Sequence, residues 1–141
     1  MINGHMTIGQ LSARTGVTVK ALREYTDLGL VHTVGRSAAG YRLYTDDALW
    51  CVRFIGELRG LGLTIAEICQ LTDTAADSSN SEAGAHLTEL LERSRQRLHR
   101  RITDAQQILD RIDDFTSTHR ARWVADDVCW TEDPCRCPTR A

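Results

Sequence analysis

Apolar residues recur at helical spacing in two short segments near the start of the chain. In the segment 7–16, Thr7 can cap a helix and Gly16 can end it. The segment 18–29 has the same organisation and follows almost directly. Two short helices joined by a tight turn that contains glycine are typical of a helix-turn-helix unit. Side chains that suit contacts with DNA lie on the second helix: Lys20, Arg23 and Tyr25.

Two short extended runs come next, at 30–34 and 41–44, and a glycine-containing loop at 35–40 separates them. This pattern predicts a β-hairpin. A hairpin directly after a helix-turn-helix forms a wing. The tip of this wing presents three side chains to a phosphate backbone: Arg36, Tyr41 and Arg42.

A third and a fourth helix are predicted after the wing. Thr45 and the two aspartates that follow it cap the third helix, the segment 60–62 breaks it, and Thr64 begins the fourth. The third helix supplies the expected core residues Trp50, Phe54, Ile55 and Leu58.

The second half of the chain has a different pattern. Residues 73–84 are small and polar, so we expect a linker. From 85 to 123 neither glycine nor proline occurs, and apolar residues alternate in steps of four and three, with Arg95 the polar exception: Leu91, Leu98, Ile102, Ala105, Leu109 and Ile112. This heptad pattern predicts a long coiled-coil helix that pairs with a second copy. The alternative is a helix that lies on the N-terminal domain.

Composition limits the classes of protein. The chain is 42% hydrophobic and 26% charged, as in a soluble globular protein, and it contains no apolar run long enough to span a membrane. An odd number of cysteines without a secretory signal indicates a reducing cytoplasm. Residues 1–6 are expected to form a disordered leader. We find no phosphate-binding glycine loop, nucleophile elbow or pair of catalytic carboxylates, and therefore predict no enzymatic activity. The net charge of −2 means that binding to DNA must rest on local basic residues.

The chain has five cysteines, and three of them lie close together near its end. Cys51 and Cys69 each lie alone in a helical pattern and are interpreted as small core residues. Three thiolates within nine residues suit a soft metal ion such as Zn, Hg, Cd or Cu(I): Cys129, Cys135 and Cys137. His119 and His86 are possible further ligands. Two alternatives stay open, namely thiol redox sensing and a tail whose cysteines have no role.

The order of these parts resembles the MerR family of bacterial transcription regulators. The similarity is carried by four stretches, 7–16, 22–30, 40–44 and 58–68. The resemblance implies a mainly α fold, in which a winged helix-turn-helix domain precedes a long antiparallel dimerisation helix and a short cysteine-containing tail. The expected boundaries are 1–6 for the leader, 7–72 for the DNA-binding domain, 73–84 for the linker, 85–123 for the dimerisation helix and 124–141 for the tail.

The resemblance also implies a function. Such regulators bind as homodimers to promoter DNA, distort it when an effector binds, and so let RNA polymerase engage both promoter elements. The family's reading-helix and wing contacts fall on Arg23, Tyr25, Tyr41 and Arg42. To these we add Thr18, Lys20, Arg36, Arg53 and Arg59 as DNA contacts. Glu24 departs from the family, because many relatives carry an aromatic residue there. The competing functions are a drug sensor and a coiled-coil interaction module that binds no DNA.

Overall fold

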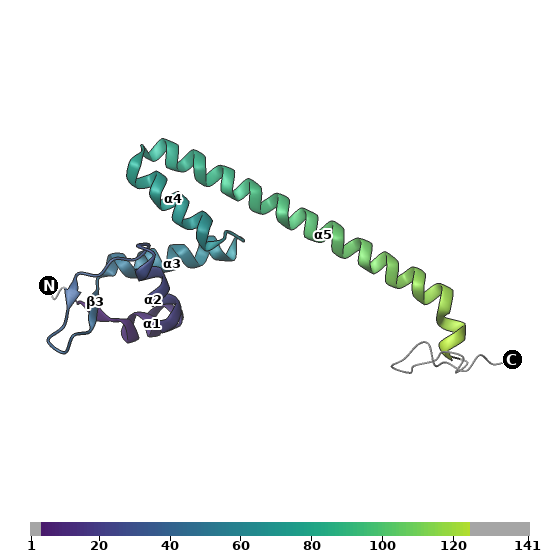
Figure 1. Cartoon of the computed structure of the whole chain (residues 1–141), viewed down its shortest axis with the longest axis horizontal. Coiled ribbons are helices and arrows are strands. Elements are labelled where there is room, and N and C mark those ends of the chain that lie inside the picture. The colour runs from purple at the N-terminus through teal and green to yellow at the C-terminus, as the bar shows by residue number, and fades with distance from the viewer. Residues whose placement is uncertain (1–3, 125–141) are drawn as a thin grey trace. The chain divides into compact units, whose positions relative to one another are not determined.

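The computed structural model describes residues 4–124, which are mainly helical (Figure 1). The chain divides into two compact units, which we call the head, Met1–Gln96, and the arm, Arg97–Ala141. The elements follow one another as β1 (Met6–Thr7), α1 (Ile8–Thr15), α2 (Val19–Asp27), β2 (Gly35–Arg36), β3 (Arg42–Tyr44), α3 (Asp46–Gly60), α4 (Ile65–Asp77) and α5 (Asn80–Val124). This order confirms the predicted winged helix-turn-helix followed by a long helix. No helix in residues 4–124 combines the length and apolar character needed to cross a membrane.

Local hydrogen bonds begin and end the two helices of the helix-turn-helix. Thr7 accepts a hydrogen bond from the backbone of Gln10, and the Gln10 side chain accepts one from the backbone of Thr7, which together form a capping box. Gly16 ends α1 with φ of 73°, a left-handed conformation that glycine adopts without a steric penalty. Thr18 then caps α2 through the backbone of Ala21. The predicted caps of α1 and α2 are therefore confirmed, whereas Thr45 stands before α3 without a side-chain hydrogen bond to the helix.

The wing belongs to a three-stranded antiparallel sheet with the order β1-β3-β2. Two expectations about it were wrong. The segment 30–34 is not a strand, because Leu30 and Val31 turn into the core and the first backbone hydrogen bond to β3 comes from Val34, which donates to the Leu43 carbonyl at 2.9 Å. The leader does not extend to residue 6, because Met6 pairs with Tyr44 and is buried. An apolar residue directly before a helix cap gains this burial by adding a strand to the wing.

The third helix buries one face and exposes the other. Ala48, Val52, Ile55 and Leu58 lie on the buried face. Trp50 was expected in the core, but it is 64% exposed and stacks on the half-buried ring of Phe54 with 5.1 Å between ring centroids. Two residues along a helix correspond to a rotation of about 200°, so Trp50 points away from the face that Ala48 and Val52 share.

The predicted linker is helical over most of its length. Helix α4 continues to Asp77, α5 begins at Asn80, and only 78–79 separate them. Ser79 and Glu82 each accept a hydrogen bond from the other's backbone N–H, so α5 begins with a capping box of the same type as that of α1. The small polar residues of the segment 73–84 therefore include the start of a helix and do not form a long loop.

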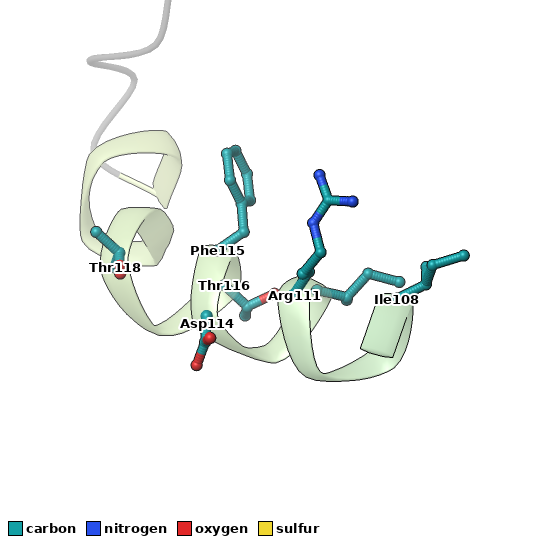
Figure 2. Close-up of a pocket in the computed structure, with 7 residues that line it drawn as sticks. Ile108, Arg111, Asp114, Phe115, Thr116 and Thr118 are labelled. Carbon is teal, nitrogen blue, oxygen red and sulfur yellow. The ribbon is translucent and has the colours of Figure 1, made fainter. Parts of the chain in front are cut away.

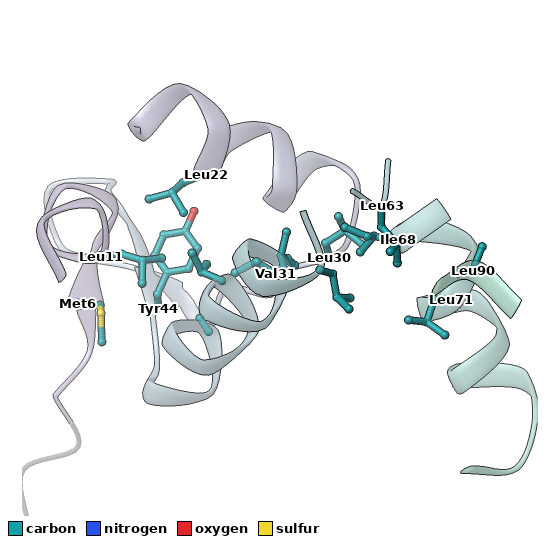
Figure 3. Packing of buried hydrophobic residues seen from close by; sticks show 14 residues of the cluster. Met6, Leu11, Leu22, Leu30, Val31, Tyr44, Leu63, Ile68, Leu71 and Leu90 are labelled. Atoms are coloured by element: carbon teal, nitrogen blue, oxygen red, sulfur yellow. The ribbon is translucent and has the colours of Figure 1, made fainter. Parts of the chain in front are cut away.

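The core runs from the helix-turn-helix to the first turns of α5 (Figure 3). Tyr44 is fully buried between α1 and α2, beside Leu11 and Leu22. Toward α5, buried side chains of α4 meet a fully buried leucine of α5, Leu90. The first part of α5 therefore belongs to the head and is held there by its own apolar residues.

A close polar contact joins α5 to the turn between α3 and α4. The buried hydroxyl of Ser94 donates a hydrogen bond to the Leu61 carbonyl at 2.6 Å. The next residue, Gly62, has φ of 91°, and a Cβ atom placed on it would lie 2.5 Å from the Ser94 oxygen. Only glycine fits this position without displacing the contact.

Candidate nucleic-acid interface

A hollow of about 320 Å³ lies between α2 and the wing. Four of the nine predicted DNA contacts line it, namely Arg23 from α2 and Arg36, Tyr41 and Arg42 from the wing. Its other lining residues are Ile8, Asp27 and Gly40. The fold thus brings together three guanidinium groups that are distant in the sequence.

Two of these arginines are already held in place by the protein. The Arg36 guanidinium donates to the Gly40 carbonyl at 2.9 Å, across the loop of the wing. The Arg42 guanidinium donates to the Asp27 carboxylate at 3.3 Å. Within residues 4–124, Arg23 forms no ion pair, and its exposed side chain is free to bind an anion.

The remaining predicted contacts on α2 lie outside this hollow. Thr18 and Lys20 are exposed at the first turn of the helix, where Thr18 also serves as the cap. Tyr25 is half-buried against the core, and its carbonyl accepts hydrogen bonds from the backbone of Leu30 and Val31. Tyr25 therefore packs against the core with part of its side chain. The sequence pattern did not distinguish such a core residue from a DNA contact.

Two predicted contacts on α3 differ from each other. Arg53 is exposed on the third helix. Arg59 donates to the carbonyl of Leu63 at 3.2 Å, so one of its nitrogens stabilises the turn between α3 and α4. The hollow between α2 and the wing includes neither residue.

Asp27 is the charged residue of the hollow that sequence reasoning missed. It follows the predicted basic residues of α2 without any motif of its own. Its partner Arg42 lies 15 residues further along the chain, so no local periodicity indicates their pairing. Only the packing of β3 against the end of α2 brings the two groups together.

The exposed face of α5 carries most of the predicted heptad seam. Leu98, Ile102, Leu109 and Ile112 are between 45% and 65% exposed, and so are Ile108 and Phe115 beside them. A hollow of about 700 Å³ lies along this face, with Ile108, Arg111 and Phe115 among its lining residues (Figure 2). Large apolar side chains exposed in a continuous row usually mark an interaction surface.

The two described cysteines have the expected structural role. Cys51 and Cys69 are half-buried and pack against the core. Burial, and secondarily the charge of Asp47, raises the pKa of the Cys51 thiol. This thiol therefore stays protonated and is a poor nucleophile at neutral pH.

The predicted metal ligands fall on two different parts of the chain. Cys129, Cys135 and Cys137 lie outside residues 4–124. The Nδ1 atom of His86 is 2.8 Å from the Thr74 hydroxyl, and the ring of His119 lies against Phe115. Among the described residues, no three His, Cys, Asp or Glu side chains are grouped so as to hold a metal ion.

The helix pair, the wing and the basic hollow define a winged helix-turn-helix protein of the DNA-binding class. A family model described as "MerR HTH family regulatory protein" matches residues 6–74, and another described as "MerR, DNA binding" matches residues 49–115. The chain belongs to the MerR family of transcriptional regulators.

Relatives and solved structures agree with this assignment. The HTH-type transcriptional regulator PA4778 of Pseudomonas aeruginosa is 31% identical over 110 residues, which cover 78% of this chain and 82% of PA4778. Heavy metal-dependent transcription regulator 1 of Rhizobium meliloti is 35% identical over 92 residues, covering 60% of this chain and 63% of that protein. The EcmrR chain, solved with DNA in the complex EcmrR-RPo, has a TM-score of 0.65 and 32% identity, over 82% of this chain and 40% of EcmrR.

Some relatives are much longer than this chain. Nodulation protein NolA of a Bradyrhizobium species is 33% identical over 121 residues, which cover 86% of this chain but only 47% of NolA. The similarity therefore covers less than half of NolA.

Proposed function

We propose that this chain is a homodimeric regulator that binds promoter DNA through α2 and the wing. The observation that carries the proposal is the gathering of Arg23, Arg36 and Arg42 around one hollow between these two elements. The whole chain has a net charge of −2, so the fold concentrates positive charge where composition alone does not. Guanidinium groups bind phosphate oxygens through paired hydrogen bonds, and such contacts supply much of the affinity for DNA.

The two elements have different roles in this proposal. Helix α2 enters the major groove, where it reaches base edges and adjoining phosphates, while the wing follows the phosphate backbone. The contacts from α2 are Thr18, Lys20, Arg23 and Tyr25. The contacts from the wing are Arg36, Tyr41 and Arg42. Arg53 and Arg59 reach further phosphates from α3.

The partner of the exposed face of α5 is a second copy of the chain. Leu98, Ile102, Leu109 and Ile112 follow the four-and-three spacing that suits pairing of two helices, and none of them is buried. Burying a leucine or isoleucine side chain stabilises a protein by about 1.5–3 kcal/mol. In a symmetric pair, each of these side chains is buried on both copies of the chain.

Charge along α5 supports an antiparallel pair. Residues 93–101 contain five arginines, whereas residues 104–114 contain four aspartates and one arginine. An antiparallel pair centred between these segments places each basic segment beside the partner's acidic one, and a parallel pair places like charges together. The same centre brings Leu98 against the partner's Leu109.

Two reading heads held by one helix pair provide a mechanism for regulation. The dimer keeps its contacts with DNA while the angle between the heads changes, and the DNA is distorted with them. Distortion brings both promoter elements into reach of RNA polymerase. The structure of the related EcmrR with DNA in EcmrR-RPo supports this mode of action.

The proposed effector is a soft metal ion held by Cys129, Cys135 and Cys137, with His119 or His86 as possible further ligands. Thiolate ligands select Zn, Hg, Cd or Cu(I) over hard cations. A relative whose name describes a heavy metal-dependent regulator supports this choice. Reversible oxidation of the same thiols is the alternative.

DNA binding is tested by selecting duplexes from a random-sequence library with the full-length chain. We expect the selected duplexes to share two related half-sites, because two identical heads read them. Arg23→Ala and Arg42→Ala should each weaken binding and lower the salt dependence by about one phosphate contact, while sedimentation still finds a dimer. If no sequence is enriched and binding vanishes at moderate salt, the chain is an interaction module instead.

The effector is tested on protein purified under reducing conditions, by elemental analysis, thiol titration and transcription assays with a panel of metals. We expect one soft metal to be bound and to induce transcription, and Cys135→Ser with Cys137→Ser to abolish induction but not DNA affinity. Induction by an oxidant without bound metal would favour redox sensing. Normal induction of the double variant would exclude both roles for the tail.

A further inference from the structure

The pairing of Asp27 with Arg42 places a carboxylate inside a hollow that otherwise carries positive charge. Asp27 is the last residue of α2 and Arg42 the first of β3. Their contact of 3.3 Å joins one guanidinium nitrogen to one carboxylate oxygen. The other guanidinium nitrogens of Arg42 therefore stay available to an anion in the hollow.

A second contact lies directly beside the first. The Thr26 hydroxyl donates to the Leu22 carbonyl at 2.7 Å, so its oxygen accepts the proton of the Tyr44 hydroxyl at 2.9 Å. Arg42 and Tyr44 are two residues apart on β3 and thus point to the same side of the strand. Two adjacent residues of α2, 26 and 27, thereby hold two side chains of the wing strand.

These contacts differ in what they can affect. The contact of Thr26 with Tyr44 belongs to the buried core, so its loss would weaken the fold. The Asp27 contact is exposed, with 67% of the Asp27 side chain and 38% of the Arg42 side chain accessible, and exposed ion pairs add little to stability. A carboxylate in the hollow also repels phosphate. Asp27 therefore lowers the positive charge that the hollow offers to phosphate, without a matching gain in the stability of the fold.

We propose that Asp27 is a positioning residue that fixes Arg42 for the correctly docked duplex and thereby raises the ratio of specific to non-specific DNA binding. An arginine held in advance loses little side-chain freedom when a phosphate arrives at the expected place. A phosphate backbone placed anywhere else meets a guanidinium that Asp27 holds away from it. This inference rests on the proposed DNA-binding function.

The test measures the affinity of full-length Asp27→Asn for a duplex selected by the wild type and for a scrambled duplex of equal length. We expect tighter binding to the scrambled duplex and unchanged or weaker binding to the selected one. The specificity ratio should fall by about twofold to tenfold, which corresponds to ordering one long side chain on binding. Asp27→Glu should recover part of the ratio, because it can still reach Arg42.

Two further variants isolate the mechanism. Asp46→Asn removes the same charge from another exposed pair, that of Asp46 with Arg14 at 4.0 Å, and should change both affinities by the same factor. In an Arg42→Gln background, Asp27→Asn should leave the ratio unchanged. An Asp27→Asn ratio equal to the wild type, or a fall of equal size with Asp46→Asn, would overturn the inference. Absence of any selective binding by the wild type would instead overturn the proposed function.

Discussion

The head and the arm use leucine and isoleucine in opposite ways. In the head, Leu90 on α5 is fully buried among side chains of the same chain. In the arm, Leu109 on the same helix is 54% exposed. One helix thus serves first as a part of a core and then as a surface. The difference teaches that apolar spacing alone predicts that a helix face will be covered, and not which chain covers it.

The largest expected effect is the loss of stability caused by shortening Leu90 in the head. Leu90→Ala leaves a cavity in the head and should lower the free energy of unfolding by about 2–5 kcal/mol. Thermal unfolding of the full chain should show this loss at every protein concentration. A loss that disappears at high concentration would mean that Leu90 serves the association of chains instead.

Leu109→Ala is the matched change in the arm. It should weaken self-association by about 3 kcal/mol or more, because two copies of the side chain leave the interface. Sedimentation should find the monomer at concentrations where the wild type is a dimer, and the melting temperature should depend on concentration. Gln107→Ala, on an exposed polar position nearby, is the control. An unchanged sedimentation profile for Leu109→Ala would contradict the proposed seam.

The junction of α5 with the head tests how strictly this helix is held. Gly62→Ala forces an alanine into φ of 91° and toward the Ser94 hydroxyl, so we expect a loss of about 1–3 kcal/mol. Gly56→Ala lies within α3 and meets nothing within 4 Å, so it should stabilise by up to about 1 kcal/mol. Denaturant unfolding of both variants measures the difference. Equal effects would show that the contact with Ser94 carries no constraint.

The smallest effect concerns Cys51. Its raised pKa means that the native thiol holds its proton more tightly than the unfolded thiol. Its contribution to stability is therefore complete below the unfolded pKa and declines as pH rises toward the native one. Alkylation of Cys51 should be slower in the native chain than in urea, as peptide mass analysis can follow. Faster native alkylation would mean that this thiol is activated and not inert.

Features with a local cause were predictable from the sequence. The caps at Thr7 and Thr64 involve side chains three residues away, so both helix starts follow from the sequence alone. The same type of signal begins α5 at Ser79 and Glu82, but small polar neighbours led to its interpretation as a linker. The long helix and its exposed seam follow from periodicity.

Features that depend on packing between distant elements were not predictable. Four predicted DNA contacts gather at one hollow, but the sequence contains no sign of Asp27 among them. The short strand at Met6 likewise forms only because it pairs with β3, 38 residues later in the chain. The exposure of Trp50 depends on which face of α3 the other helices cover.

The wing strand changes its surroundings within a few residues. Tyr44 at its end has no exposed surface, whereas Tyr41 just before its start is 63% exposed. Thermal motion should therefore be small at Tyr44 and grow toward the loop, a gradient that amide relaxation measurements by NMR can detect. A duplex that binds the tip would reduce the motion of the loop, while the base of the hairpin would be as ordered in the free protein as in the complex.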